Sequence, residues 1–276
     1  MWLRFLAFPL ALLAGVAAIG VCAVGLVVVL AWPNLPSLEV LTDYQPKIPL
    51  RVYTAEGVLI GEFGEERRAV VKISEVPEVL KRAILAAEDE RFYQHAGIDY
   101  QGVLRAAVSN LTSGGRRQGA STITMQVARN FFLSSEKTLT RKLYEALLAF
   151  KIEHNLEKDQ ILELYVNQIY LGQRAYGFAA AAQIYYGRSL DKLTLPEAAM
   201  LAGLPKAPST YNPVVNPQRA RQRQQYVLRR MKDLGHVSEQ QYAEALKTPI
   251  VVRRDSNEFA VHAEHVAEMV RQAVAE

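Results

Sequence analysis

The stretch SEVPEVLKRAILAAEDERFYQHAG, residues 74 to 97, decides the fold class predicted for this chain. Its apolar residues recur at the spacing of a helix face, at Val76, Leu80, Ala83, Ile84 and Ala87. Ser74 is the predicted N-cap of this helix, and the apolar stripe is expected to end near Gly97. The stretch therefore indicates a fold built around helices.

Helical patterns continue along most of the chain after this stretch. Further helices are predicted at about 99–112, 122–132, 138–156, 159–171 and 175–186. A capping box at Thr194–Glu197 begins another helix, which Gly203 and Pro205 close. The remaining predicted elements are a helix from Ser238 to Leu246, a β-like Ile250–Val252 and an amphipathic stretch at 259–275. The fold class predicted is mainly α.

Three different segments precede the helices. From Phe5 to Ala31 no side chain is charged, and this run exceeds the roughly 20 residues that a helix needs to cross a bilayer. The segment is therefore predicted to span a membrane. Four prolines between residues 33 and 50 predict an extended linker without regular structure. Leu50–Phe63 alternates and turns at Glu56-Gly57, which predicts a short β-hairpin.

The apolar start of the chain also bears on its location. A cleaved signal peptide is the competing interpretation, but its apolar region would be only about 7 to 15 residues long. Arg4 is the only charged side chain before the span, and the positive-inside rule then favours a cytoplasmic N-terminus. The rest of the chain would lie outside the cytoplasm. The single cysteine, Cys22, falls inside the predicted span, so no disulfide framework is expected.

Positive charge is concentrated in one part of the chain. The formal net charge is +4, and residues 111 to 151 hold seven lysines or arginines against only Glu136 and Glu145. A nucleic acid is one partner for such a patch, but an outward-facing domain rarely meets it. An anionic lipid surface or a phosphate-bearing substrate is the favoured interpretation.

Glu88 is the first candidate for chemistry. It follows Ile84 by one helical turn and so lies at the edge of the apolar stripe. Partial desolvation and a position late in the helix both disfavour the ionised carboxylate, so its pKa should rise toward that of a general base. Periodicity alone favours a surface glutamate at a helix end over a catalytic one. Asp89 could brace the turn, and His95 could be a capping or core histidine.

A glycine-rich segment followed by hydroxyl groups is the second candidate. Ser113-Gly114-Gly115 precedes Gly119–Asn130, in which Ser121 and Thr122 open a helix and Arg129 adds charge. Free backbone N–H groups at a helix start suit an anion site. An ordinary N-cap explains Ser121 as well.

A charged triplet on one helix is the third candidate. Arg141 and Glu145 are four residues apart and Lys142 and Glu145 are three apart, so all three can meet on one side of the helix. Such triplets are usually solvated surface pairs. None of the three segments identifies a function by itself.

Taken together and in order, these segments resemble the motifs of family 51 glycosyltransferases. The resemblance covers about residues 65 to 215, and the hairpin and apolar anchor fit class A penicillin-binding proteins of this family. The matching segments are Glu88-Asp89 with Phe92, His95 and Gly97; Gly119–Asn130; Arg141-Lys142 with Glu145; Ile161–Asn167 with Tyr170-Leu171-Gly172; and Ala202–Ser209. The resemblance implies a lysozyme-like, two-lobed domain with a small β-hairpin, preceded by one transmembrane helix.

The resemblance also implies an activity and a set of site residues. The expected reaction is polymerisation of lipid II into glycan strands, with inversion at the donor anomeric carbon and release of undecaprenyl pyrophosphate. Glu88 is the expected base, and Glu145 is the second catalytic residue, which positions the cations or a divalent ion. The expected substrate-binding residues are Asp89, Phe92, His95, Ser121, Thr122, Gln126, Arg129, Asn130, Arg141, Lys142 and Lys206. Pyrophosphate is a good leaving group, so cations and oriented donors should replace a second acid.

Further expectations concern cofactors, partners and domains. No obligatory cofactor is expected, and Glu145 is the candidate ligand for a divalent cation, magnesium or manganese. The expected partners are lipid II, the nascent glycan strand and the lipid bilayer, with a homodimer and cell-wall synthesis proteins left open and nucleic acid excluded. The chain is expected in the bacterial cytoplasmic membrane as a single-pass protein with an extracytoplasmic catalytic domain that binds moenomycin. Its predicted divisions are residues 1–32 as cytoplasmic stub and anchor, 33–50 as linker, 51–230 as glycosyltransferase domain, and 231–276 as a connector toward an absent transpeptidase domain.

Several alternatives stay open at this point. A lysozyme-like lytic enzyme that cleaves glycan with one glutamate is the second hypothesis, and an inactive scaffold is the third. Phe131-Phe132-Leu133 fits either a lipid-dipping surface or a core cluster. Ser134 begins a Ser-x-x-Lys pattern, but no Lys-Thr-Gly accompanies it, so Ser134 is expected to be a loop residue and transpeptidation to be absent.

Overall fold

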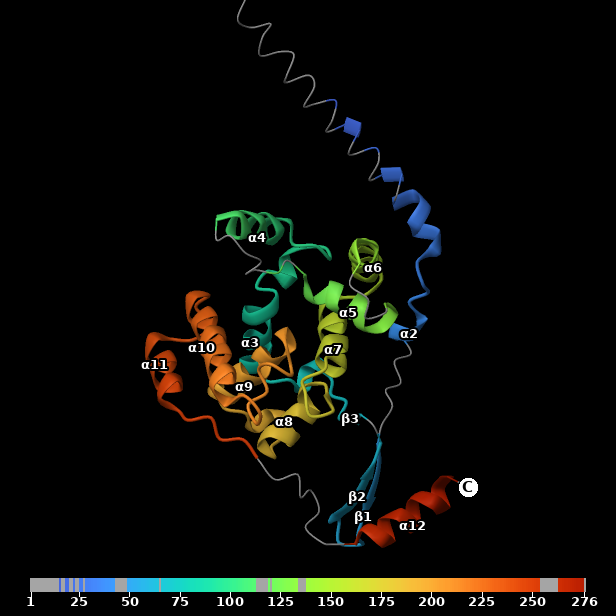
Figure 1. Ribbon diagram of the computed structural model, residues 1–276, viewed down its shortest axis with the longest axis vertical. Coiled ribbons are helices and arrows are strands. Elements are labelled where there is room, and N and C mark those ends of the chain that lie inside the picture. The colour runs from blue at the N-terminus through green and yellow to red at the C-terminus, as the bar shows by residue number, and fades with distance from the viewer. Residues whose placement is uncertain are drawn as a thin grey trace, which may run out of the picture.

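The computed structural model describes residues 28–42, 49–64, 66–112, 119, 121–133, 138–253 and 263–275, with a few isolated positions before residue 28. Helices dominate the described residues, as predicted, and strands are few and short (Figure 1). The helices after the hairpin are α3 (Glu78–Glu88), α4 (Tyr100–Thr112), α5 (Ile123–Phe132), α6 (Leu139–Asn155), α7 (Lys158–Gln168), α8 (Phe178–Tyr186), α9 (Leu195–Gly203), α10 (Pro217–Asp233), α11 (Glu239–Lys247) and α12 (Glu264–Ala275).

The predicted membrane span cannot be followed in the structure. Most of Phe5–Ala31, and the Ser134 pattern as well, lie outside the described residues. Among the residues that are described, none of the helices combines the length and the apolar character needed to cross a bilayer. The linker prediction is wrong in detail, because a 3₁₀ turn (η1, Trp32–Asn34) and a one-turn helix (α2, Glu39–Thr42) interrupt it. Proline occupies the first turn of η1, where its missing N–H costs nothing.

Helix α3 is shorter at both ends than its sequence pattern predicted. Ser74 lies inside a 3₁₀ turn (η2, Ile73–Glu75), and the helix begins only after Pro77, which occupies the N-cap position with an extended ψ of 144°. At the other end Asp89 leaves the helical region, with φ −159° and ψ 78°, and a separate 3₁₀ turn (η3, Phe92–Gln94) follows. Glu88 is therefore the last residue of the helix rather than a residue within it.

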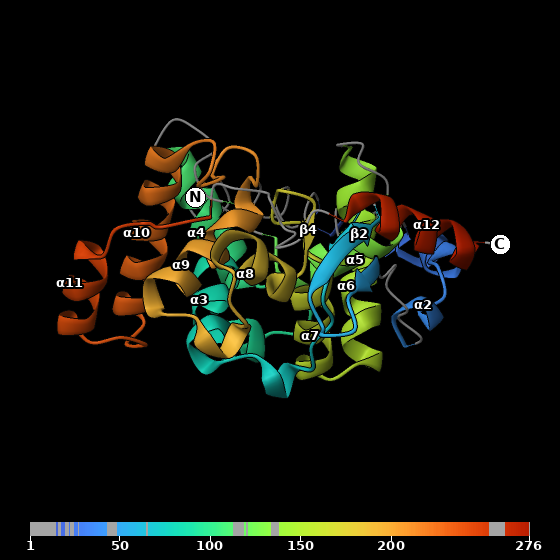
Figure 2. The ribbon, with the colours of Figure 1, turned by 90° about the horizontal axis from the view of Figure 1, so that it is seen from below.

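The helices bury a single large apolar core. Leu80, Ala83 and Ile84 on α3 are fully buried, and α3 packs against α9 and α10, whereas α5 packs against α6 and α7. Figures 1 and 2 show α3 between the α9–α10 pair and the α5–α7 group. The end of α3 consequently lies where two groups of helices meet.

The predicted hairpin is confirmed. Strands β1 (Leu50–Tyr53) and β2 (Leu59–Phe63) pair antiparallel, and Gly57 at the turn has a φ of 82° that favours glycine. The hairpin shares a small separate core with α12, away from the main helices (Figure 1). Contact is close there, since a Cβ on Gly61 would lie 2.6 Å from the Cβ of Ala267.

Three sequence predictions later in the chain need correction, and one helix was missed. The helix predicted at 159–171 ends at Gln168, and the one predicted from 175 begins at Phe178, because β4 (Ala175–Tyr176) pairs in parallel with β3 (Arg67–Arg68). Ile250–Val252 forms no strand. Helix α10 (Pro217–Asp233) was not predicted. It extends across residue 230, and the domain boundary expected there stays a prediction. The capping box at Thr194 and the Ser238 cap are confirmed.

The side chain of Asn167, on helix α7, links this helix to the segment that precedes α3. Its buried side chain accepts a hydrogen bond from the Val71 amide at 2.9 Å and donates to the carbonyls of Val71 at 2.8 Å and Glu163 at 3.0 Å. One amide side chain therefore satisfies backbone groups of two segments that are distant in sequence.

We predict that Asn167→Ala destabilises the protein by about 2 to 4 kcal/mol, because it removes these bonds and leaves partly buried backbone groups of Val71 unpaired. Chemical denaturation followed by circular dichroism measures this change. Asn155→Ala is the matched control, since Asn155 makes one exposed bond to the Lys151 carbonyl and its loss should cost no more than about 0.5 kcal/mol. Equal destabilisation by the two variants would contradict the role given to Asn167.

Candidate active site

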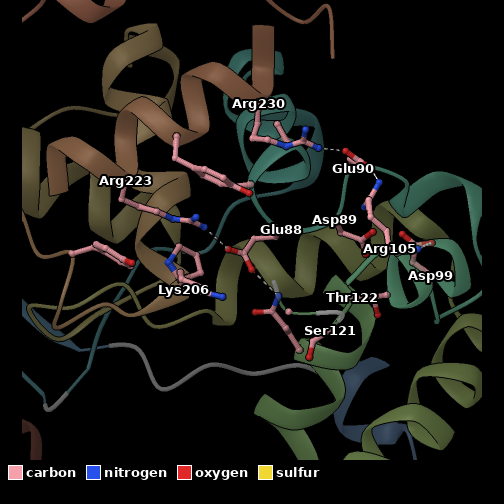
Figure 3. Close-up of a pocket in the computed structure, with 18 of the residues that line it drawn as sticks. Glu88, Asp89, Glu90, Asp99, Arg105, Ser121, Thr122, Lys206, Arg223 and Arg230 are labelled. Atoms are coloured by element: carbon pink, nitrogen blue, oxygen red, sulfur yellow. Dashed lines mark hydrogen bonds and ion pairs between the residues drawn. The ribbon is translucent and has the colours of Figure 1, made fainter. Parts of the chain in front are cut away.

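A cavity of about 580 Å³ lies at the end of α3. It is lined from one side by α4 and α5 with the residues just before α5, and from the other side by α10 and the 3₁₀ turn η5 (Leu204–Lys206). Figure 3 shows Glu88 in the middle, with Ser121 and Thr122 on one side and Lys206 and Arg223 on the other. Seven of the predicted site residues line it: Glu88, Asp89, Ser121, Thr122, Gln126, Arg129 and Lys206.

Glu88 is a largely buried acid in the lining of the cavity. Its side chain is 11 % exposed. Oε2 accepts a hydrogen bond from Gln126 Nε2 at 2.9 Å, while Oε1 faces the Arg223 guanidinium at 3.6 Å. Burial raises the pKa of Glu88, although the Gln126 bond and the charges of Arg223, Lys206 and Arg129 act in the opposite direction. The expected raised pKa of this carboxyl agrees with its environment, and desolvation is the main cause.

Two of the cations near Glu88 are available for a ligand. Lys206 is exposed and Arg129 is half-buried, and neither makes a hydrogen bond or close ion pair with any residue that the structure describes. Both line the cavity. An anionic group entering the cavity would therefore meet two cations that it need not compete for.

Asp89 has a structural task that the sequence only hinted at. Its carboxylate accepts a hydrogen bond from the Ile123 amide at 3.0 Å and lies 3.0 Å from His95 Nε2. Ile123 is the first residue of α5, so Asp89 supplies a negative charge to the positive end of that helix. The bond joins the end of α3 to the start of α5 and fixes how Glu88 faces Gln126.

The predicted anion site at the start of α5 is thus largely occupied by the protein itself. The N-cap is Thr122 rather than Ser121: its hydroxyl accepts from the Met125 amide at 3.2 Å and donates to the Gly97 carbonyl at 2.6 Å. The expected outward-pointing N–H groups of Ile123 and Met125 are engaged. The preceding Ser113-Gly114-Gly115 lies outside the described residues.

The charged triplet on α6 forms as predicted but is not a solvated surface group. Glu145 is 1 % exposed, and its two oxygens face Arg141 Nε at 3.1 Å and Lys142 Nζ. Lys142 also donates to Ser121 Oγ at 2.9 Å, which links the triplet to the cavity wall. Lys142 keeps 43 % of its side chain exposed, so the ammonium group remains accessible.

The divalent cation expected at Glu145 does not fit these donors. Such an ion needs several oxygen ligands, whereas both Glu145 oxygens face cationic side chains. No group of three or more histidine, cysteine or acidic residues suited to a metal occurs in the described part of the chain.

Six predicted site residues lie outside the cavity lining: Phe92, His95, Asn130, Arg141, Lys142 and Glu145. Phe92 is fully buried, with the Lys158 ammonium 4.4 Å from its ring centre. His95 is held by Asp89. Phe92 and His95 therefore lie outside the cavity lining, and His95 supports the lining residue Asp89. Contact of Phe92, His95 and Asn130 with substrate stays a prediction.

Sequence reasoning missed most of the wall that α10 and its surroundings provide. The unpredicted lining residues with polar or aromatic side chains are Glu90, Asp99, Arg105, Tyr211, Gln222, Arg223, Tyr226 and Arg230. Glu90 pairs with Arg105 at 2.5 Å and with Arg230. The signal that could have found α10 was Asn216-Pro217 before an arginine-rich run, because proline is favoured at the first helical position.

Comparisons with known proteins agree with the geometry. The family model described as Transglycosylase matches residues 56–232. Penicillin-binding protein 1A of Neisseria cinerea is 56 % identical over 265 residues, which cover 96 % of this chain and 33 % of that protein. The protein of the same name from Pseudomonas aeruginosa is 50 % identical over 239 residues, covering 87 % of this chain and 29 % of the relative.

A solved structure is also similar. The crystal structure of Penicillin-binding protein 1A from Haemophilus influenzae matches with a TM-score of 0.48 and 36 % identity, over 83 % of this chain and 24 % of that one. The chain spans about a third of the length of the curated relatives named above. From the family match and these identities, the chain belongs to the transglycosylase family and is a peptidoglycan glycosyltransferase domain of the class A penicillin-binding protein type.

Proposed function

We propose that the cavity polymerises lipid II into glycan strands, with inversion at the donor anomeric carbon. The observation that carries this proposal is one buried carboxylate, Glu88, with a raised pKa, facing a cavity whose free charges are positive. Lipid II as acceptor and a growing glycan on undecaprenyl pyrophosphate as donor fit this arrangement. The lysozyme-like, two-lobed description belongs to the same proposal, and the lining of the cavity from two groups of helices supports it.

Glu88 acts as the general base. It removes the proton of the acceptor 4-hydroxyl while that oxygen forms a bond to the donor anomeric carbon, and the bond from that carbon to the diphosphate oxygen breaks on the opposite face. A carboxylate with a raised pKa accepts a proton more readily at neutral pH than an ordinary one. Gln126 binds Oε2 of Glu88, so the other carboxylate oxygen, Oε1, faces the side of the cavity where Arg223 lies.

Cations rather than an acid assist the leaving group. Lys206 and Arg129 line the cavity without close partners among the described residues, and Lys142 reaches the wall through Ser121. Developing negative charge on the diphosphate is stabilised by such preplaced groups. Glu145 holds Arg141 and Lys142 in place, which is a positioning role.

A lytic enzyme that cleaves glycan is the alternative, and the other acids of the cavity argue against a paired-carboxylate scheme. Asp89 is bonded to Ile123 and His95, Glu90 is paired with two arginines, and Asp99 is paired with Arg91. Incubation with lipid II and, separately, with preformed glycan distinguishes the two functions: we expect polymer from the first and no shortening of the second.

The bilayer is proposed as a partner through α4 rather than through Phe131–Leu133. The latter residues are half-buried and pack against the core. On α4, Leu104 is 67 % and Leu111 is 83 % exposed, while Gly102 and Arg105 of the same helix line the cavity. An apolar face beside the substrate cavity suits a substrate whose tail lies in lipid. Single-pass anchoring with an extracytoplasmic domain is part of this proposal.

We predict that Glu88→Gln lowers polymerisation of lipid II by about 10²- to 10⁴-fold, the usual contribution of a general base. Glutamine keeps the size of the side chain, so the variant should unfold at the wild-type temperature. Gel analysis of the glycan product measures the loss. Full polymerisation by this variant would show that another group is the base.

The pH profile should report the buried base directly. A raised pKa means that Glu88 becomes protonated, and the activity is lost, as the pH falls through a value above the usual range of glutamic acid. We therefore expect an acidic limb of kcat/KM on lipid II that lies above this range. A profile that stays flat down to the ordinary glutamate range would contradict the burial argument.

Negative charges introduced on the apolar face of α4 should raise the KM for substrate that is embedded in a membrane. We predict that Leu104→Glu combined with Leu111→Glu raises KM for lipid II in vesicles at least several-fold, with little change for a short-chain, water-soluble analogue. Val215→Glu is the control, because Val215 is 65 % exposed and does not belong to α4. Equal effects on both substrates would argue against a lipid contact at α4.

A further inference from the structure

Arg223 shares the Glu88 carboxylate with Gln126. Gln126 on α5 binds Oε2, and Arg223 on α10 faces Oε1 with its Nη2 atom at 3.6 Å (Figure 3). The two partners come from the two groups of helices on either side of the cavity. The carboxylate is therefore held from both sides, and neither the Glu88 motif nor its sequence neighbourhood contains the second partner.

The Arg223 side chain is itself fixed in place. It is 12 % exposed, and its Nε donates to the Gly203 carbonyl at 3.2 Å. The guanidinium carbon lies 4.6 Å from the ring centre of Tyr226 and 5.9 Å from that of Tyr211. Gly203 leaves room for the stem, because a Cβ there would lie 2.9 Å from Arg223 Cγ. The charge of Arg223 is thus preorganised, at distances where cation–π attraction contributes.

We propose that Arg223 is a positioning residue for the catalytic base, holding the Glu88 carboxylate in its ionised form and directed toward the cavity. This inference rests on the proposed function of Glu88. It assigns to α10 a part in the chemistry that none of the motif residues supplies.

The other charges around Glu88 show why Arg223, and not another cation, would keep the Glu88 carboxylate ionised. The titratable or charged groups whose charges act on or adjoin Glu88 are Arg223 of α10, Lys206 of η5, Arg129 of α5, Tyr165 of α7, and the neighbouring Asp89 and Glu90. Asp89 and Glu90 are held by their own partners. Lys206 and Arg129 lack close partners among the described residues and would turn to a bound diphosphate. Arg223 is braced by Gly203 and Tyr226, so its charge stays with Glu88 when substrate arrives.

Loss of the Arg223 cation should raise the pKa of Glu88. Removing the Arg223 cation takes away stabilisation of the ionised carboxylate, so Glu88 should accept a proton at higher pH. The base itself remains intact, and activity should therefore return as the pH is raised. A purely structural role would lower activity at every pH alike.

The test compares pH profiles of lipid II polymerisation by the full chain and its variants. Arg223→Met should move the acidic limb of kcat/KM up by about one pH unit, at the lower end of the effect of a nearby opposite charge, with kcat rather than KM carrying most of the change. Arg223→Lys keeps the charge and should keep the limb near the wild-type position, while kcat falls because an ammonium group lacks the planar fork. Arg229→Met, which removes an exposed arginine of the same helix, is the matched control and should match the wild type.

Gly203→Ala tests the same idea without altering Arg223. The added methyl group displaces the arginine stem and should shift the limb in the same direction as Arg223→Met, by a smaller amount. The Gly203→Ala variant also keeps the proposal testable if Arg223→Met fails to fold. Unshifted limbs in Arg223→Met and Gly203→Ala would overturn the proposal, and so would equal shifts in the lysine and methionine variants. Activity of Glu88→Gln in the same assay would instead overturn the proposed function of Glu88.

Discussion

Burial of one carboxylate at the end of a helix is the constraint on which the site depends. Glu88 loses its hydration where α3 ends, and desolvation dominates its pKa. An ionised acid in such a place is tolerated only when hydrogen bonds and opposite charges compensate for lost water. Gln126 and Arg223 supply this compensation from two different groups of helices. The packing of α3 against α9 and α10 is therefore part of the chemistry and not only of stability.

A second carboxylate, one residue further along, organises the other wall. Asp89 binds the first amide of α5 and so sets the position of that helix relative to α3. Thr122, Gln126 and Arg129 follow at spacings of four and three residues, which places them on one face, and all three line the cavity. By fixing the start of α5, the Asp89 carboxylate directs the Gln126 amide toward Glu88. It also leaves the Arg129 cation facing the cavity, where substrate can bind it.

The cavity and the surface beside it suit a molecule with a charged middle and an apolar end. Lys206 and Arg129 provide positive charge on the two sides of the cavity, and the accessible Lys142 adds a third cation beside Ser121. Helix α4 presents Gly102 and Arg105 to the same cavity and a row of large apolar side chains to its outside. A lipid-linked diphosphate sugar could keep its tail in a bilayer against α4 while its head group enters the cavity.

Local interactions explain what the sequence by itself determined. The α-helical class, the spans of α4 to α6, the caps at Thr194 and Ser238, and the meeting of Arg141, Lys142 and Glu145 all follow from contacts within a few residues. The choice of Glu88 came from motif resemblance, since periodicity alone favoured a surface residue. Only the tertiary structure decided that α3 stops at Glu88, that Asp89 occupies the start of α5, and that α10 brings Arg223 to the base. These features depend on the packing of helices distant in sequence, and no local pattern records which side chains such packing brings together.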